Sequence, residues 1–345
     1  MANRMGVTLQ DIANLAGVTK MTVSLVLNSR QYGRVSAETR RRVEEIAREL
    51  NYRPNQAARQ LTGKRSGILG LLMPRTARVH AFHRLKAVDM EALNRGYRLM
   101  AGHTSSIDDS LDAYLDDFET RGVEGIIWMG HQDFADQRVI EAMQRSVPIV
   151  MISQPVPLGA HCVMLDYVDA IRQVMAHLVR QGRKRIAIAL HAEQWIGNQE
   201  RLAGYLQGLR EAGMQEEEAL VWRRRQPDRR ESLPDPQNVE QIVQKLAIEQ
   251  HADAIIANND IWAADLIRAL RQRGLHVPRD VAVVGQDNTE LAEHFDPPIT
   301  SLDLQPTVVA RRAMEMLSRV IEGPPLPPDR RQSMVPMKLV PRESA

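Results

Sequence analysis

Short apolar runs of strand length alternate with amphipathic segments along most of this chain, from Ser66 onward. Most runs are followed by apolar residues at helical spacing, such as Leu85, Val88 and Leu93. This alternation predicts an α/β fold with parallel sheets covered by helices on both faces. The segment that shows this alternation is too long to form a single sheet, so we expect it to fold into two lobes. The runs are "GILGLLM" at 67–73, "YRLMAGH" at 97–103, "VEGIIWMG" at 123–130, "VPIVMIS" at 147–153, "KRIAIAL" at 184–190, "ADAIIANN" at 252–259, "VAVVGQD" at 281–287 and "ITSLDL" at 299–304.

Polar side chains follow several of these runs where the predicted strands end. Ligands of open parallel sheets bind beyond the carboxyl ends of the strands, so we expect a binding cleft there. Asp260 has an alternative role, because an Asp ahead of "IWAADLIRAL" can simply cap that helix. The polar residues in question are His103, His131, Ser153, Asn258, Asn259, Asp260, Asp287 and Asn288.

The first 65 residues are basic, whereas the rest of the chain is acidic. They hold 12 Lys and Arg against 5 Asp and Glu, a net charge of +7, while the remainder holds 33 against 38, a net charge of −5. A small basic module of this kind matches the electrostatic footprint of a nucleic-acid binder. The alternative is a solvated basic surface, which charge alone does not exclude.

The basic module has the signals of a helix-turn-helix unit. Thr8 begins a first helix with a capping-box pattern, and Gly17 can end it. Thr19 then caps a second, short helix whose residues Val23, Val26 and Leu27 share one apolar face. In such units the exposed N-terminal residues of the second helix reach base edges in the major groove.

A third helix begins after Ser36 and ends before Pro54. Its apolar residues lie at helical spacing and can cover the faces of the first two helices. The polar stretch that follows, Asn55 to Thr62, contains helix-forming residues but only one large apolar side chain, Leu61. A helix this short does not persist alone in water, so the stretch is either a hinge that orders on binding or a plain linker.

The run from Val7 to Ser66 closely resembles the DNA-binding headpiece and hinge of the lac repressor (LacI/GalR) family. The matching stretches are "VTLQDIANLAGVTKMTVSLVLN", "VSAETRRRVEEIARELNYRPN" and "ARQLTGKRS". The resemblance implies a DNA-binding domain at 1–53, a hinge at 54–65 and an effector-binding, dimerising core at 66–345. The DNA contacts that it implies are Thr8, Thr19, Lys20, Met21, Thr22, Ser24, Leu25 and Asn28, with Asn55, Ala58 and Leu61 in the hinge.

Leu61 matches the hinge residue that wedges into the minor groove and kinks the DNA in this family. Leu25 is a departure, because many members have an Arg there that can donate two hydrogen bonds to guanine. A Leu can only make apolar contacts, such as with a thymine methyl, while Lys20 can still donate to guanine. We therefore expect a half-site that differs from that of Arg-bearing relatives.

The same resemblance implies that the core consists of two doubly wound lobes similar to periplasmic sugar-binding proteins, joined by three crossovers. The first lobe would hold about 66–161 with a segment near 291–322, and the second about 162–290 with about 323–345. An effector would lie between them. Its expected contacts are His80, His103, Arg201, Asn259, Asp260 and Asp287, although Arg201 could also be an ordinary surface arginine of its helix.

The loop "MPRTARVHAFHR" departs most from the family pattern. Members commonly place two aromatic residues where His80 and Ala81 fall, whereas this loop is crowded with Arg75, Arg78, His83 and Arg84. If these cations face the cleft, they favour an anionic effector such as a sugar acid or sugar phosphate over a neutral sugar. Solvated basic side chains are the alternative.

Other classes of protein fit less well. The chain has no motif of a nucleotide-binding loop, a hydrolase nucleophile or a zinc protease, and its histidines lack metal-ligand spacing, so we expect neither an enzyme nor a bound metal or cofactor. No segment has the length of a membrane span, and the N-terminus has no signal-peptide pattern, so we expect a cytoplasmic protein without a membrane partner. A secreted solute-binding protein and a nucleoid protein that ignores small molecules remain as rivals.

These observations together predict a DNA-binding transcriptional regulator, most simply a repressor. Its partners would be double-stranded operator DNA with a pseudo-palindromic sequence, a second copy of the chain and a small-molecule effector. The C-terminal sequence "VPMKLVPRESA" has no leucine heptads for a tetramer-forming coil, which favours a homodimer. The sign of the effector's action stays open.

Overall fold

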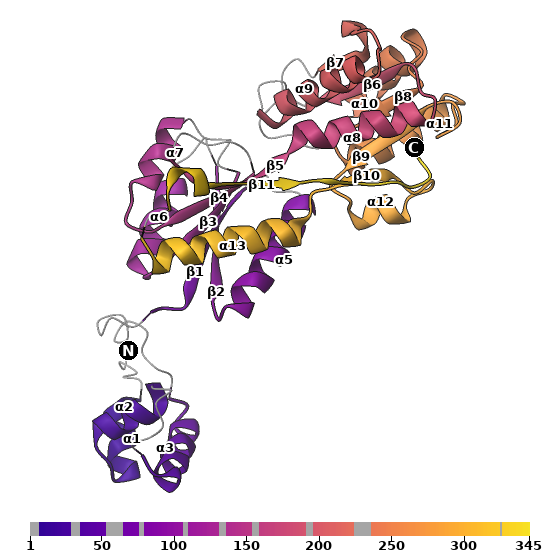
Figure 1. Ribbon diagram of the computed structural model, residues 1–345. Helices are drawn as coiled ribbons and strands as arrows, with labels where there is room; N and C mark the ends of the chain where they lie inside the picture. The colour runs from indigo at the N-terminus through magenta and orange to yellow at the C-terminus, as the bar shows by residue number, and fades with distance from the viewer. Residues whose placement is uncertain are drawn as a thin grey trace. The chain divides into compact units, whose positions relative to one another are not determined.

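The computed structural model describes residues 7–28, 35–52, 65–75, 79–105, 110–130, 136–153, 159–190, 196–223, 236–324 and 326–345. The chain divides into two compact units, Met1–Ser66 and Gly67–Ala345, which we call the headpiece and the core. Figure 1 shows the helices α1, α2 and α3 in the headpiece, and sheets with helices packed on them in the core. The α/β class with an all-helical N-terminal module is therefore confirmed.

The headpiece contains α1 (Leu9–Ala16), α2 (Lys20–Asn28) and α3 (Ala37–Glu49). The predicted capping box of α1 is present, since Thr8 Oγ1 accepts the N–H of Asp11 and the Asp11 carboxylate accepts the N–H of Thr8 at 2.8 Å. Gly17 ends α1 with φ at 63°, a left-handed conformation that glycine adopts without a steric penalty. Ser36 caps α3 by accepting the N–H of Thr39 at 3.2 Å.

The three helices bury one small apolar core between them. The spacing of Val23, Val26 and Leu27 predicted their shared face, and the first two are buried while Leu27 packs at the edge. Burial of this stripe fixes which side of α2 faces outward. The buried residues of the cluster are Ile12, Ala13, Ala16, Val23, Val26, Val43 and Ala47.

The core is built on two six-stranded sheets. The first is parallel throughout, in the order β11 (Gln332–Pro336), β5 (His161–Asp166), β4 (Ile149–Ser153), β3 (Ile126–Met129), β1 (Ile68–Pro74), β2 (Arg98–Thr104). The second has the order β12 (Lys338–Val340), β10 (Thr300–Asp303), β9 (Ala282–Gln286), β8 (Ala254–Ile256), β6 (Ile186–Leu190), β7 (Val221–Arg223). Its strands are parallel except for β12, which is antiparallel to β10.

Helices cover both faces of each sheet, as the strand and helix alternation predicted. On the first sheet, α5 (Val79–Asn94) and α13 (Pro306–Glu322) pack together on one side, and α6 (Ser110–Thr120) and α7 (Asp136–Met143) lie on the other. Leu71 and Leu72, adjacent on β1, point into these two separate apolar clusters. Because successive strand side chains alternate between faces, a strand covered on both sides is apolar throughout.

The second sheet has α8 (Tyr167–Arg180) and α9 (Ile196–Glu211) on one face. On its other face are α10 (Pro236–Ile242), the π-helical segment η4 (Val243–Glu249) and α11 (Asp260–Gln272). The short helix α12 (Glu290–His294) packs against α11, and two 3₁₀ turns are η3 (Glu218–Leu220) and η5 (Pro328–Arg330). Among the described residues, no helix combines the length and apolar character that crossing a bilayer requires.

The chain passes between the sheets after β5, after β10 and after β11, which gives the expected three crossovers. The lobe boundaries that we expected are wrong in detail. His161–Asp166 and Gln332–Pro336 pair in the first sheet rather than the second, whereas Glu290–His294 and Thr300–Asp303 belong with the second. A parallel strand buried on both faces is equally apolar in either sheet, so its sequence does not say which sheet it joins.

Candidate functional site

The N-terminal turn of α2 forms an outward-facing polar surface on the headpiece. Thr19 Oγ1 accepts the N–H of Thr22 at 3.1 Å, and the two hydroxyl oxygens lie 2.9 Å apart. Lys20 is exposed, and the Met21 side chain is 74% exposed although it is a large apolar residue. Because Val23 is fully buried on the opposite side, this turn is held by the core and free to contact a partner.

The other expected headpiece contacts have mixed placements. Thr8 is used in the capping box with Asp11, which places its hydroxyl at the N-terminus of α1. Ser24 and Leu25 are half-buried on α2. Asn28 is the last residue of α2, and its side chain lies outside the described part.

Several expected positions fall outside the described residues altogether. These are the hinge residues Asn55, Ala58 and Leu61, together with Arg78 and His131 of the core. Their roles stay predictions.

Arg201 lies in a buried polar cage at the carboxyl edge of the second sheet. It is only 9% exposed, and its Nη1 donates to Asn198 Oδ1 at 3.1 Å and to Asn258 Oδ1 at 2.8 Å. Its guanidinium carbon lies 5.0 Å from the centroid of the Tyr167 ring, a cation–π contact. Its Nε is buried without a hydrogen-bond acceptor among the described residues. Arg201 is therefore a buried residue and not an ordinary surface arginine. Its Nε is an exception to the rule that buried donors have an acceptor.

Asn259, rather than Asp260, caps α11. Asn259 Oδ1 accepts the N–H of Trp262 at 3.0 Å, and Asn259 itself is 7% exposed. The capping role that we considered for Asp260 therefore belongs to its neighbour.

Asp260 is an internal carboxylate. It is 1% exposed, and its Oδ2 accepts the N–H and the hydroxyl of Thr289 at 2.8 and 2.9 Å, while its Oδ1 accepts the hydroxyl of Ser301 at 2.5 Å. Burial, with a smaller contribution from the nearby Asp287 carboxylate, raises the pKa of Asp260 to about 7. Both oxygens are used within the protein, which favours a structural role over direct contact with an effector.

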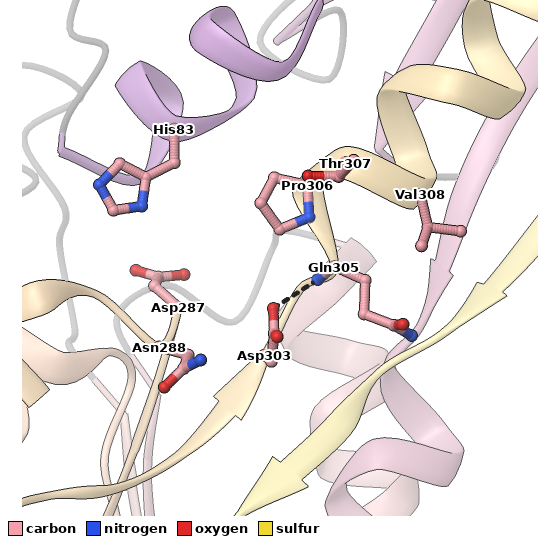
Figure 2. Close-up of a pocket in the computed structure, with 8 residues that line it drawn as sticks. All are labelled: His83, Asp287, Asn288, Asp303, Gln305, Pro306, Thr307 and Val308. Carbon is pink, nitrogen blue, oxygen red and sulfur yellow. Dashed lines mark hydrogen bonds between the residues drawn. The ribbon is translucent and has the colours of Figure 1, made fainter. Parts of the chain in front are cut away.

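Asp287 lies on the wall of a cavity of about 360 Å³. The cavity brings together α5 of the first lobe, the β9–α12 loop of the second lobe and the crossover that leads from β10 into α13. Figure 2 shows the His83 ring facing the Asp287 carboxylate across it. Asp303 Oδ1 accepts the N–H of Gln305 at 2.7 Å within the crossover. The cavity is lined by His83, Asp287, Asn288, Asp303, Gln305, Pro306, Thr307 and Val308.

The basic residues of the first-lobe loop are mostly not part of this wall. His83 lines it, but its Nε2 lies 3.0 Å from the Glu290 carboxylate of α12, so the imidazole already has an acidic partner. Arg75 is exposed at the end of β1, and His103 is exposed near the end of β2. His80 lies in α5, but its side chain is outside the described part.

Sequence reasoning missed several residues that the fold brings to this region. Asp303 is near the end of the run "ITSLDL" and Gln305 directly follows it, so the rule that ligands bind beyond strand ends could have found them. Tyr167 could not have been found in this way, because its contact with Arg201 depends on how α8 and α9 pack. Asn198 lies three residues before Arg201 on α9, so helical spacing could have paired the two.

Arg201 lies at the same edge of the second sheet but does not line this cavity. The carboxylates of Asp287 and Asp303 and the amides of the cavity wall suit a ligand rich in hydroxyl groups. Each hydroxyl can both donate and accept a hydrogen bond, so donors and acceptors in the protein can both be used. In the part of the chain that the structure describes, no three His, Cys, Asp or Glu side chains gather as they would around a metal ion.

Comparison with protein families matches both units of the chain. Residues 8–55 match the family described as "Bacterial regulatory proteins, lacI family", and residues 175–345 match the "Periplasmic binding protein-like domain". The regulator DegA of Bacillus subtilis (strain 168) is 32% identical over 301 residues, which cover 86% of each chain. The regulator CelR of Thermobifida fusca is 32% identical over 333 residues and 92% of each chain, and the repressor CytR of Escherichia coli (strain K12) is 26% identical.

Solved structures match over nearly the full length. A Lac repressor dimer bound to operator and the anti-inducer ONPF has a TM-score of 0.81 at 25% identity, covering 98% of this chain and 99% of that one. A complex of the regulator CelR with cellobiose has a TM-score of 0.68 at 27% identity, covering 98% of this chain and 100% of that one. The relatives are named transcriptional regulators rather than enzymes, in agreement with the sequence analysis.

Proposed function

This chain belongs to the lacI family of bacterial transcriptional regulators, and from that premise we propose that it is a repressor that binds a pseudo-palindromic operator as a homodimer. A small molecule held in the core controls the binding. The exposed N-terminal turn of α2 carries the DNA half of this proposal, because it presents Lys20 and Met21 on a headpiece of net positive charge. Its chromosomal target places the protein in the cytoplasm.

Base reading would fall to the side chains at and after this turn. Lys20 can donate to the O6 and N7 atoms of guanine, and Thr22 can donate or accept. Leu25 offers only apolar contact at the position where many members have an Arg. The hinge residues Asn55, Ala58 and Leu61 would add minor-groove contacts.

Selection of binding sites from a random DNA pool by the full-length protein tests this half of the proposal. One palindromic consensus, with an affinity that falls steeply as salt rises, is expected of a symmetric dimer that neutralises phosphates. Salt-sensitive binding without a consensus would favour a nucleoid protein instead. Repression itself is measured by placing the selected sequence across a reporter promoter, where expression should fall when the protein is present.

A stripe of exposed apolar side chains on α5 supports the homodimer. Phe82, Met90 and Leu93 are 62%, 51% and 43% exposed, and their spacing places them along one side of the helix. Helical spacing predicted that Leu93 would be buried with Val88, but the buried position is Ala92. Large apolar side chains exposed along one side of a surface helix are typical of an interface between protein chains.

Light scattering on a variant with Phe82→Ser and Met90→Ser tests this interface. We expect the mass to shift from dimer toward monomer at micromolar concentration. The matched control is Leu15→Ser in the headpiece, where the leucine is 63% exposed, and this change should leave the mass unaltered. A dimer of unchanged stability in the α5 variant would move the interface elsewhere.

We propose that the effector is a sugar or sugar derivative, bound by Arg201 and Asp287. The relative CelR has been solved with cellobiose, which supports a sugar in this family. Asp287 and Asp303 line the cavity, and His83 is paired with Glu290. The carboxylates of Asp287 and Asp303 favour a neutral sugar over an anionic one, because they would repel the negative charge of a sugar acid or sugar phosphate. His80, His103 and Asn259 stay as further candidates for effector contact.

A thermal-shift titration of the full-length protein decides the effector class. The probes are cellobiose, and glucose compared with glucose 6-phosphate and gluconate. A ligand that binds the folded state raises Tm with concentration. A larger shift with a neutral sugar than with its acid or phosphate is expected, and tighter binding of the phosphate would restore the anionic alternative.

A further inference from the structure

The loop that carries Asp287 has an unusual backbone. Asp287 and Asn288 have φ values of 101° and 49°, in the region that L residues rarely adopt. Such a conformation is costly for residues other than glycine and persists only when the surroundings hold it. The direction in which Asp287 points from β9 depends on this conformation.

Three successive amides of the loop are tied to neighbouring segments. Asp287 N–H donates to Leu302 O at 2.9 Å, and Asn288 N–H donates to Ser301 Oγ at 3.1 Å. Thr289 N–H donates to Asp260 Oδ2 at 2.8 Å. The first of these bonds is made by the backbone of β10, whereas the other two depend on side chains.

Both of the hydrogen bonds that use side chains depend on Asp260. It accepts the Thr289 amide directly, and it accepts the hydroxyl of Ser301, whose oxygen in turn receives the Asn288 amide. A hydroxyl that donates to a carboxylate is a better acceptor, because the chained bonds polarise one another. One carboxylate therefore fixes two consecutive amides of a strained loop.

The site around Asp260 leaves room for this carboxylate and for little else. Asp260 is 1% exposed in the first turn of α11, and it packs against β9 at Gly285. A Cβ on Gly285 would overlap Asp260 Oδ1, so the missing side chain is what admits the carboxylate. Enclosed in this way, Asp260 has no path to an effector.

We propose that Asp260 is a positioning residue, which holds Asp287 and Asn288 of the loop in their positive-φ conformation and so aims Asp287 at the effector. The holding role stands on the contacts above, and its consequence for effector binding rests on the proposed function. Arg342 assists from the C-terminal segment, since its Nη2 donates to Asn288 Oδ1 at 2.7 Å. The loop is thus fixed by residues far away in the sequence.

Hydrogen exchange of the full-length protein, resolved to single amides, tests the holding role without any ligand or DNA. In Asp260→Ala we expect the Asn288 and Thr289 amides to exchange about tenfold faster or more, since each has a hydrogen bond that depends on the carboxyl group of Asp260. The amides of β9 should be unchanged. Asp265→Ala is the matched control, because Asp265 lies on the same helix and pairs only weakly with Arg268 at 3.6 Å.

Two milder variants separate positioning from a general loss of structure. Asp260→Asn keeps an oxygen for the Thr289 amide and should restore slow exchange at both positions. Ser301→Ala removes the acceptor of Asn288 and one hydroxyl donor to Asp260, but it leaves the bond from the Thr289 amide to Asp260 Oδ2. Asn288 should therefore exchange faster while Thr289 does not. Unchanged exchange in both Asp260→Ala and Ser301→Ala would overturn the proposal.

Sugar titrations of the same variants connect the loop to the proposed function. If Asp260→Ala frees the loop and weakens binding of the sugar that stabilises the wild type most, both ideas stand. Faster exchange with unaltered sugar affinity leaves the holding role intact and removes Asp287 from the effector site. The two failures are therefore distinguishable.

Discussion

The headpiece and the core obtain their functional surfaces in different ways. In the headpiece, Thr8, Thr19 and Ser36 bind amides three residues away in the sequence, and these local caps define the helices that present Lys20 and Met21. In the core, Asp260 binds a hydroxyl 41 residues away and Arg342 binds Asn288 across 54 residues. The proposed DNA-reading surface is encoded locally, whereas the proposed effector site exists only once the lobes have folded.

Because of this difference, we expect DNA binding and effector sensing to be lost independently of each other. A change in the headpiece should alter DNA binding without touching the core, and a change in the cleft should alter sensing without touching the basal affinity for DNA.

The largest expected effect comes from Val23→Asp, which places a charge in the headpiece core where Val23 is fully buried. The cost of about 3 kcal/mol or more is comparable to the stability of so small a module, so the headpiece should unfold. Affinity for the selected operator should fall about a thousandfold, to the level of non-specific binding. The main thermal transition of the core and its response to sugar should persist. Their loss would show that the core depends on the headpiece.

Leu61→Ala tests the hinge, whose position lies outside the described residues. Without the wedge, the kink that permits extra contacts is no longer supported, so operator affinity should fall roughly ten- to a hundredfold. Gel-shift titration measures this, and a thermal-shift titration in parallel should show unchanged sugar binding. A comparable loss of operator binding and sugar binding would contradict the independence of the headpiece and the core.

Arg201→Ala is the corresponding test in the core. It removes a buried cation from the cage of Asn198 and Asn258, and we expect sugar affinity to fall about tenfold and the operator response to disappear. Operator affinity without sugar should stay within about twofold. Arg210→Ala on the same helix is the control, since Arg210 is exposed and forms an ion pair with Glu216 on the surface. A normal response in Arg201→Ala would take Arg201 out of the site.

Leu25→Arg sharpens the reading of the headpiece. An arginine there can donate two hydrogen bonds to guanine, so one base pair of each half-site should become G·C, with a preference of about 1–3 kcal/mol. Repeating the random-pool selection measures the change. An unaltered consensus would mean that Leu25 does not face the bases.

The smallest expected effect is a pH dependence confined to the core. The pKa of Asp260 is raised from its usual 3.8 to about 7, so the folded state favours the protonated acid. The stability that this provides is fully present below about pH 4 and is lost as pH rises through 7. Asp260→Asn removes the titration, so between pH 5 and 8 the Tm of the variant should fall less than that of the wild type, by about a few degrees. Parallel Tm profiles would contradict the raised pKa.

Features encoded by nearby residues could be predicted from the sequence, whereas features that depend on distant residues could not. The caps, the glycine turn and the apolar face of α2 are all local patterns, and the structure confirms them. The eight apolar runs of the core are strands, because burial on both faces leaves a continuous apolar signal. The lobe boundaries were wrong, because the strand at His161–Asp166 carries no signal that distinguishes the two sheets.

The candidate effector site was only partly predictable. The rule for strand ends pointed to Asp287 and Asp260, which both lie at that edge, but could not tell a cavity-lining carboxylate from an enclosed one. That distinction depends on Thr289, Ser301 and the space above Gly285, which come together only in the fold.

The most direct test of the account is the affinity of the full-length protein for its selected operator, with and without a saturating amount of the sugar that raises Tm most. The account predicts a change of about 5- to 150-fold, in either direction, because a core that senses and a headpiece that reads must be coupled by about 1–3 kcal/mol. An affinity that stays the same within about twofold would mean that the core binds its sugar without controlling the headpiece.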